Sequence, residues 1–478
     1  MQDKTQNSVT TQNIKLGDIE FPPRKVWVKT YGCQMNYHDT ERLLSHLSTL
    51  NFTATEEQSD ADLVLFNTCA IRDLANQKFY SHLGETKKLK DENKPQFKEG
   101  VKIGVGGCIA QTEGSELIKK YDQLDFAFGT DVIDNISEMV YRTYAGDSKF
   151  SVNTWDRSND YSIDTKITHD TPQAFVNIIK GCDKFCSYCI VPFTRGREKS
   201  RRMAEIVKDV SRLVEYSGIQ EVTLLGQNVN SFGKENGESL GQLIHALNEI
   251  NGLEIIRYTT SHPYDMSDEL IAAHGACQKL ANHVHLPVQS GSNTVLQRML
   301  REYTAEHYLG LLEKLRKANP AIVISSDIIA GFPNETEEEH RDTLKLLDAA
   351  QYDFIYSYAF SARKGTKAAR MKDILTEDVR GRRLREIQAH QLKIQEAVRA
   401  DMVGKTFRML VDEKNTFKNE TKWKGRTNCY RIVHFKPDNE EMDYKWHWVD
   451  VKVTSATALS CQGELVRDLG KKPSSLIQ

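Results

Sequence analysis

The stretch KGCDKFCSYCIVPFTRGR, residues 180–197, holds three of the nine cysteines of this 478-residue chain. Cys182, Cys186 and Cys189 are spaced as C-x3-C-x2-C, with no fourth cysteine or histidine in the stretch. Structural zinc takes four tetrahedral ligands, commonly in two spaced pairs, whereas a four-iron cluster takes one cysteine per iron. Three cysteines therefore favour a four-iron cluster with one iron open to a small molecule. Zinc or a purely structural role is the alternative.

The stretch follows the first of about six alternating strand and helix patterns between residues 171 and 398. Apolar runs such as "EVTLLGQN" and "AIVISSDIIAGFP" are separated by helical stretches such as "RRMAEIVKDVSRLVEYS". This alternation predicts parallel strands, and six units fall short of the eight in a full barrel. We therefore predict a partial (βα)6 barrel, open at one side, with its catalytic face at the carboxyl ends of the strands.

Polar or small residues end the later strands on that predicted face. Taken singly, each could equally form a turn or cap a helix. Taken as a set, they are candidates for holding a small molecule beside the cysteine loop. They are Gly226, Gln227, Asn228, Gln289, Asp327 and Gly331.

Three more cysteines end strands in an earlier part of the chain, residues 24–145. Cys33, Cys69 and Cys108 follow the runs "KVWVKTYG", "ADLVLFNT" and "VKIGVGG", which alternate with helical patterns. The alternation predicts an α/β domain with a doubly wound parallel sheet. Open parallel sheets bind ligands at the carboxyl edge of their strands. Three cysteines at that edge favour a shared metal site over three unrelated buried thiols.

The remaining residues divide into connecting and peripheral segments. Residues 1–23 are predicted to be a disordered leader, and the polar, aperiodic residues 146–170 a linker. Short alternating runs without helical period predict a small antiparallel β barrel over residues 401–466, followed by a tail, 467–478.

The composition limits the possible partners. The formal net charge is −2, so any nucleic-acid site must be a local patch rather than a bulk positive field. No apolar run approaches the roughly 18 residues of a membrane span, and the polar N-terminus has no signal-peptide core. We predict a cytoplasmic protein without a membrane partner.

Two local patches could contact a phosphate backbone. "TRGREKSRR" lies just beyond the cysteine loop, and "WKGRTNCY" interleaves aromatic and basic residues in the predicted small barrel. A solvated run of charge is the alternative for the first patch. The candidate nucleic-acid-binding residues are Arg195, Arg197, Arg201, Arg202, Trp423, Lys424, Arg426 and Tyr430.

Taken in order, the motifs resemble those of one enzyme family over residues 24–466. A C-x3-C-x2-C loop after the first strand of a partial barrel is similar to the radical S-adenosylmethionine (SAM) superfamily. An N-terminal domain with three further cysteines and a C-terminal TRAM barrel resembles its methylthiotransferases. "TYGCQMN", "NTCAIRDLA", "GGCIAQ", "CDKFCSYCIVPFTRGRE", "LLGQNVN", "TTSHP" and "HLPVQSGS" resemble the branch that acts on isopentenylated adenosine in tRNA (MiaB type). "GFPNET" and "SARKGT" depart slightly from the usual loops.

The resemblance implies a transferase with two [4Fe–4S] clusters. It implies a radical SAM cluster on Cys182, Cys186 and Cys189, and an auxiliary cluster on Cys33, Cys69 and Cys108. One SAM is expected to donate a methyl group and a second to yield a 5′-deoxyadenosyl radical, so that C2 of N6-isopentenyladenosine at position 37 is methylthiolated. SAM contacts are expected at the six strand-end residues named above.

The implied partners are tRNA, an electron donor of the flavodoxin or ferredoxin type, and a carrier of sulfur or iron–sulfur clusters. A relative acting on threonylcarbamoyl-adenosine or on a ribosomal-protein aspartate is an alternative. A non-enzymatic iron–sulfur sensor that binds tRNA is another.

Overall fold

The structure is a computed structural model that describes residues 14–16, 18–71, 73–91, 98, 100–155, 171–417, 420–439 and 441–471. It divides into two compact units. The first comprises Met1–Thr168 with Lys180–Asp183 and Ile190–Glu198, and the second comprises the rest. The cysteine loop therefore contributes to both units: Cys182 belongs to the first, and Cys186 and Cys189 belong to the second.

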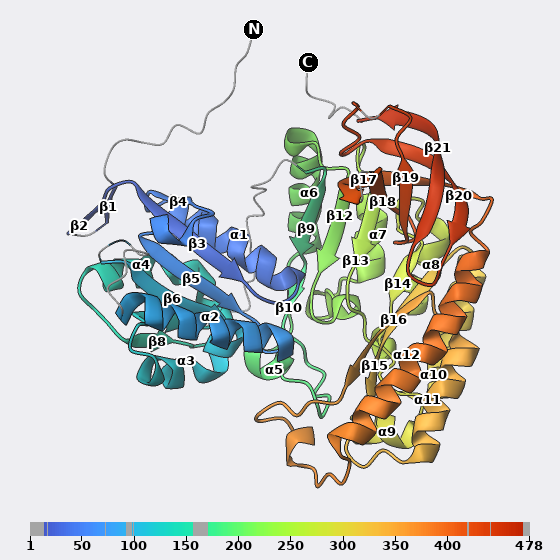
Figure 1. Ribbon diagram of the computed structural model, residues 1–478, viewed down its shortest axis with the longest axis horizontal. Helices are drawn as coiled ribbons and strands as arrows, with labels where there is room; N and C mark the ends of the chain where they lie inside the picture. The colour runs from blue at the N-terminus through green and yellow to red at the C-terminus, as the bar shows by residue number, and fades with distance from the viewer. Residues whose placement is uncertain are drawn as a thin grey trace. The chain divides into compact units, whose positions relative to one another are not determined.

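The first unit is a six-stranded, all-parallel sheet in the order β4-β3-β5-β6-β7-β8. Its central strand β5, LVLFNT, is buried at every position. One core packs α2 and α3 against one face, and a second core packs α1 and α4 against the other (Figure 1). The predicted doubly wound parallel sheet is confirmed. The elements are β1 (Ile14–Leu16), β2 (Ile19–Phe21), β3 (Arg24–Thr30), α1 (Gln34–Ser48), β4 (Phe52–Ala54), the 3-10 helix η1 (Gln58–Asp60), β5 (Leu63–Thr68), α2 (Asp73–Asp91), β6 (Lys102–Gly107), α3 (Cys108–Lys120), β7 (Phe126–Phe128), η2 (Thr130–Asn135), α4 (Ile136–Tyr144), β8 (Phe150–Val152) and α5 (Val191–Thr194).

The second unit begins with a barrel of six parallel strands. They form two three-stranded sheets, β13-β12-β9 and β14-β15-β16, and a parallel bridge joins Ile256 of β13 to Leu280 just before β14. α6 ends at Gly218, which adopts the left-handed conformation that commonly ends helices. The predicted partial (βα)6 barrel is confirmed. The elements are β9 (Gln173–Asn177), β10 (Ile179–Lys180), β11 (Lys199–Ser200), α6 (Met203–Ser217), β12 (Glu221–Leu225), η3 (Val229–Ser231), η4 (Lys234–Asn236), α7 (Leu240–Asn248), β13 (Ile255–Tyr258), η5 (Pro263–Asp265), α8 (Asp268–Ala276), β14 (His283–His285), α9 (Asn293–Arg298), α10 (Ala305–Ala318), β15 (Val323–Ala330), α11 (Glu337–Ala350), β16 (Phe354–Ala359), η6 (Ala368–Arg370) and α12 (Glu377–Ala400).

A closed five-stranded barrel in the order β17-β18-β19-β21-β20 completes the second unit. The pairs are antiparallel except β19 with β21, which is parallel. This barrel is joined to the partial barrel by buried contacts: the Arg257 guanidinium donates to the carbonyls of Thr427 and Asn428, and Trp448 Nε1 donates to Gln220 Oε1. The strands are β17 (Thr406–Phe417), β18 (Glu420–Thr427), β19 (Ile432–Lys436), β20 (Trp448–Ala456) and β21 (Cys461–Gly470).

Three predicted boundaries are wrong at their edges. The leader predicted for residues 1–23 contains the antiparallel pair β1 and β2, whose Phe21 is fully buried in the core of the first unit; residues 1–13 lie outside the described part. In the linker predicted for 146–170, β8 adds an edge strand to the sheet, while 156–170 lie outside the described part. The small barrel continues through β21 to Gly470, beyond the predicted end at 466.

Candidate functional site

The three cysteines of the first unit lie at adjacent strand ends, as the sequence predicted. Cys33 caps α1 after β3, Cys69 follows β5, and Cys108 is the first residue of α3 after β6. Gly32 has φ of 121°, and a Cβ there would lie 2.9 Å from Cys69 Sγ. The loops that carry Cys33 and Cys69 are therefore in close contact, and only glycine fits between them.

Two buried asparagines hold these loops together. Asn36 Nδ2 donates to the Thr68 carbonyl at 3.0 Å, and Asn67 Nδ2 donates to the Asn36 carbonyl at 2.8 Å. Thr68 in turn donates from Oγ1 to the Gly106 carbonyl at 2.6 Å and accepts from the backbone N–H of Ile109. All three cysteine-bearing segments are thus crosslinked by hydrogen bonds. The sequence reasoning did not single out either asparagine, although "MN" and "FNTC" placed both beside the cysteines.

The loop with Cys186 and Cys189 is fixed within the second unit. Ser187 donates from Oγ to the Arg298 carbonyl at 2.8 Å, and its carbonyl accepts from the backbone N–H of Ala368 at 2.7 Å. The Cys189 backbone N–H donates to the Cys186 carbonyl at 3.0 Å, which makes a tight turn. Cys182 lies in the first unit, where its backbone N–H donates to the Gly196 carbonyl at 3.1 Å.

A buried arginine lies against Cys186. Arg301 Nη1 donates to Cys186 Sγ at 3.4 Å, while Nε donates to Tyr303 Oη and Nη2 to the Pro287 carbonyl. Burial by itself lowers the pKa of Arg301, but the nearby phenols and the Cys186 thiol raise it above its usual value. The guanidinium therefore stays charged beside the sulfur, as suits a thiolate ligand. Nothing in the spacing of the sequence pointed to Arg301.

The strand-end residues predicted to contact SAM fall into two groups. Asn228 and Gln289 lie shortly beyond the carboxyl ends of β12 and β14, whereas Asp327, which was predicted to end a strand, lies inside β15, which continues to Ala330. Asn228 Nδ2 donates to the buried Asp265 carboxylate at 2.7 Å, and Asp327 lies 3.4 Å from His285 Nε2. Gln289 has φ of 73°, a strained value for a residue with a side chain. Gln227, partly buried, immediately precedes Asn228.

The two glycines of that set have packing roles in the structure. A Cβ on Gly226 would lie 2.4 Å from Ile179 Cγ2, and one on Gly331 would lie 2.5 Å from Arg380 Cγ. The Gly331 backbone N–H and carbonyl are already bonded to Glu335 and Arg380. Close packing therefore accounts for both glycines without a ligand.

A neutral histidine lies on the same face of the barrel. His262, from the motif "TTSHP", is buried and packs edge-on against Tyr303. Burial, reinforced by the charges of Arg301, Lys184 and Lys234, lowers the pKa of His262 to about 2. His262 is therefore uncharged at neutral pH and serves as a hydrogen-bonding group.

Several predicted tRNA contacts are corrected by burial. Arg195 and Arg201 are buried in ion pairs, Arg195 with Asp39 and Arg201 with Asp209. Trp423 is only 3% exposed, in the core of the small barrel. These three side chains cannot reach a phosphate backbone because the fold already covers them.

The other predicted tRNA contacts of the small barrel differ in how far the fold already pairs or buries them. Tyr430 stacks on His283 with ring centroids 5.0 Å apart, so it packs against the partial barrel. Lys424 is paired with Glu413 at 2.5 Å, and Glu413 lines a surface pocket whose side chains are half acidic. Arg426 remains partly exposed, 3.7 Å from an Asp412 carboxylate oxygen.

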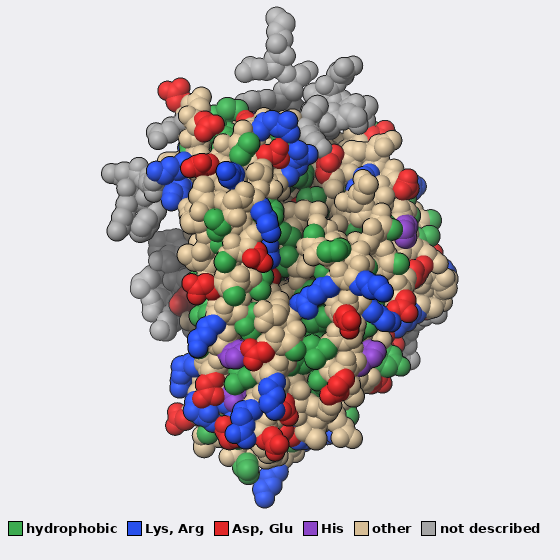
Figure 2. Space-filling view, turned by 90° about the vertical axis from the view of Figure 1, so that its right-hand side faces the viewer, with side chains coloured by type: hydrophobic (Ala, Val, Ile, Leu, Met, Phe, Trp, Pro, Cys, Tyr) green, Lys and Arg blue, Asp and Glu red, His purple; other side chains and the backbone are tan. Residues whose placement is uncertain are grey.

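Two cations of the first patch remain accessible. The Arg197 side chain is 67% exposed, and Arg202, at the start of α6, is also exposed. Figure 2 shows one face of the molecule, on which Lys and Arg side chains lie among Asp and Glu side chains without forming one continuous basic patch. Phosphate contacts must therefore come from local groups such as these two.

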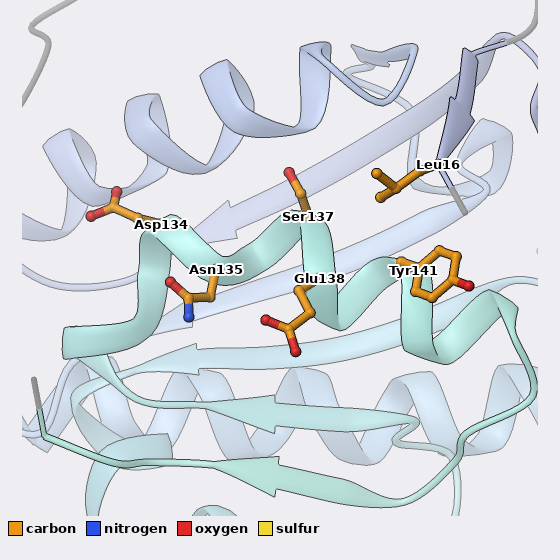
Figure 3. Close-up of a pocket in the computed structure, with 6 residues that line it drawn as sticks. All are labelled: Leu16, Asp134, Asn135, Ser137, Glu138 and Tyr141. Atoms are coloured by element: carbon orange, nitrogen blue, oxygen red, sulfur yellow. The ribbon is translucent and has the colours of Figure 1, made fainter. Parts of the chain in front are cut away.

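A surface pocket of about 650 Å³ lies away from the cysteines. Figure 3 shows its lining side chains, which come from η2, α4 and β1 and include no cysteine and no strand-end residue. It has no part in the candidate site.

The donor sets fit clusters better than a single ion. Within the described ranges, no three His, Cys, Asp or Glu side chains are grouped so as to hold one metal ion. A four-iron cluster instead takes each thiolate on a different iron, which needs a wider spacing of sulfurs. A buried cation accompanies each set and suits thiolate ligands: the charges of Cys33 and Cys108 act on Arg195 in the first unit, and Arg301 donates to Cys186 Sγ in the second.

Two family models match the chain. Residues 25–129 match UPF0004, described as an uncharacterized protein family, and residues 176–347 match the radical SAM superfamily. The fold is similar to that of the radical SAM methyltransferase TsrM from Kitasatospora setae, with a TM-score of 0.51 and 14% identity over 70% of this chain and 72% of that chain. The superfamily match brings SAM and a [4Fe–4S] cluster as cofactors.

Curated relatives extend the similarity to nearly the whole chain. A tRNA-2-methylthio-N(6)-dimethylallyladenosine synthase from Bdellovibrio bacteriovorus is 39% identical over 98% of this chain and 100% of its own length. One from Staphylococcus haemolyticus is 41% identical over 87% of this chain and 80% of its length. The chain therefore belongs to the tRNA-2-methylthio-N(6)-dimethylallyladenosine synthase family of radical SAM proteins.

Proposed function

We propose that this chain methylthiolates C2 of N6-isopentenyladenosine at position 37 of tRNA, next to the anticodon. The observation that carries the proposal is the pair of separate three-cysteine sets, each at the carboxyl end of parallel strands, in a chain about 40% identical to synthases named for this product. One set would hold the cluster that binds SAM, and the second would serve the sulfur transfer that the relatives' product requires.

The cysteines would hold two [4Fe–4S] clusters. Cys182, Cys186 and Cys189 would hold the cluster that binds SAM, and Cys33, Cys69 and Cys108 the auxiliary one. Together these groups supply the chemistry that replaces an unactivated aromatic C–H by a methylthio group, with one SAM as methyl donor and one as source of the 5′-deoxyadenosyl radical.

The chain's own residues would orient SAM beside the loop. Asn228 presents an amide whose Nδ2 is held by Asp265, and Asp265 is also 2.6 Å from Lys234 Nζ and 3.4 Å from Lys184 Nζ. This network fixes the position of Asn228 at the end of β12. Gln227 and Gln289 lie shortly beyond strand ends of the same barrel, and Asp327 lies inside β15; these side chains would bind the remaining polar groups of SAM. Neutral His262 adds a hydrogen-bonding group without a charge.

The interior of the partial barrel offers a surface for the adenine. Phe354, Tyr356 and Tyr358 alternate along β16 and so share one face, and helices cover the outer face of such barrels. Tyr356 and Tyr358 are 46% and 50% exposed, and Tyr356 packs edge-on against His285. Half-exposed rings on an inward face suit stacking against a base or contact with an isopentenyl chain.

The partners follow from this chemistry. tRNA would be approached through accessible cations such as Arg197 and Arg202, and Arg426 could contribute from the small barrel. An electron donor of the flavodoxin or ferredoxin type would reduce the cluster, and a carrier would resupply sulfur. No helix in the described part of the chain is long and apolar enough to cross a bilayer. A cytoplasmic location, where tRNA is modified, fits this function.

The decisive experiment is methylthiolation by the purified, anaerobically reconstituted protein. With SAM and a reductant, isopentenylated tRNA should yield 2-methylthio-N6-isopentenyladenosine, while unmodified tRNA should not react. C33A/C69A/C108A should abolish the product yet still form 5′-deoxyadenosine, and C182A/C186A/C189A should abolish both. Product from threonylcarbamoylated tRNA or from a ribosomal protein instead would replace this proposal by that alternative, and absence of SAM cleavage by the wild type would favour a sensor.

A further inference from the structure

Arg195 is buried in the first unit although its sequence context suggested a surface cation. It is 7% exposed and follows α5, whose Thr194 carbonyl accepts from Thr130 Oγ1 at 2.5 Å. Its guanidinium Nη1 lies 2.7 Å from Asp39 Oδ2, and the Asp39 side chain is 1% exposed. Burying such a pair carries a desolvation cost, and removing one partner would leave the other charge buried and unpaired.

The pair lies beside the first set of cysteines. Asp39 is on α1, the helix that Cys33 caps, and α5 packs against α3, the helix that Cys108 begins. Burial by itself lowers the pKa of Arg195, but Asp39 and then the thiols of Cys108 and Cys33 raise it above its usual value. The cation therefore persists next to two of the three sulfur ligands.

One donor of this guanidinium has no partner. Arg195 Nη2 is buried and makes no hydrogen bond with any described residue. A buried donor without an acceptor costs roughly 1–3 kcal/mol, so such groups are normally satisfied. Sulfur at the adjacent cysteine site is the acceptor that would satisfy it. Arg301 shows the same use of a guanidinium in the second unit, since its Nη1 donates to Cys186 Sγ.

We infer that Arg195 belongs to the auxiliary cluster site, where it donates to sulfur and holds a positive charge that Asp39 partly offsets. This rests on the auxiliary cluster of the proposed function. Net charge and hydrogen bonds to sulfur set the reduction potential of an iron–sulfur cluster. A nearby cation favours the reduced, more negative state and raises the potential, and a nearby anion lowers it. The two members of the pair therefore act in opposite directions.

The test is a potentiometric titration of the auxiliary cluster, followed by electron paramagnetic resonance. It uses the full-length chain with C182A/C186A/C189A, so that only the auxiliary cluster contributes, and the reconstituted wild type is measured in parallel. R195Q should lower the midpoint potential, D39N should raise it, and R195K should shift it less than R195Q. R142Q removes a partly exposed cation of the same unit, paired with Asp147, and should leave the potential unchanged.

The double variant R195Q/D39N distinguishes an electrostatic effect on the potential from a folding defect. It removes both buried charges and should return the potential toward the parent value, with unchanged iron content. Shifts of the same sign in R195Q and D39N, or no shift in either, would overturn the role of Arg195 while leaving the proposed function intact. A parent variant that binds no cluster would overturn the two-cluster function itself, and this inference with it.

Discussion

Tyr358 provides the sharpest test of the barrel interior as the place where the adenine binds. It is half exposed on the inward face of β16, two residues after Tyr356. Removing an aromatic ring that stacks on a base costs about 1–3 kcal/mol, which corresponds to a roughly 5- to 150-fold loss of affinity. Y358A should therefore weaken binding of isopentenylated tRNA by a factor in that range.

The assay is the Kd for isopentenylated tRNA, measured together with 5′-deoxyadenosine formation in the absence of tRNA. Y358F keeps the ring and should bind nearly as the wild type does. Y216A removes a 73% exposed tyrosine from α6 and should have no effect. SAM cleavage without tRNA should stay unchanged in all three, because none of them replaces a residue assigned to a cluster or to SAM. Equal affinities of Y358A and Y216A would refute base stacking at β16.

Three further outcomes are expected. R301M should lower SAM cleavage at least tenfold and shift the potential of the radical SAM cluster downward, because the donor to Cys186 Sγ is lost; unchanged potential would contradict this. Burial raises the pKa of Glu41 to about 7, so the folded state resists an ionisation that the unfolded chain undergoes near pH 4.5. E41Q should consequently stabilise the protein by on the order of 1–3 kcal/mol above pH 7 and by nothing near pH 4.5, as thermal melts at both pH values would show. R257M should lower the unfolding free energy of the second unit by about 3–5 kcal/mol, because it leaves the buried Glu221 carboxylate without its cation and removes two hydrogen bonds to the small barrel. In denaturant titrations, the unfolding free energy of the double variant R257M/E221L should fall by less.

Deleting the small barrel would disturb the partial barrel as well, because buried contacts join the two. Arg257, Gln220 and His283 of the partial barrel bond to or stack on residues of the small barrel. Deleting everything after Met402 would expose these groups and disturb the partial barrel. Loss of tRNA binding by such a truncation would therefore not by itself identify an RNA-binding surface.

The sequence by itself determined the two cysteine sets and the architecture that presents them. Strand periodicity and cysteine position are local properties, and the carboxyl ends of parallel strands meet at one edge whatever the details of packing. Thus Cys33, Cys69 and Cys108 could be assigned to one edge from three short runs of sequence. The six strand–helix units could also be predicted from the sequence, because each carries its own apolar pattern.

Only the tertiary structure decided which charged and aromatic residues face solvent. Arg195, Arg197, Arg201 and Arg202 look alike in "TRGREKSRR", yet two are buried with carboxylates and two are exposed. The difference depends on Asp39 and Asp209, whose positions relative to the arginines arise only when separate elements pack together. Trp423 likewise became a core residue because a closed barrel has an interior, which alternation along one strand cannot reveal. Burial depends on how the whole fold packs, and the partner that a charged side chain finds depends on it in the same way.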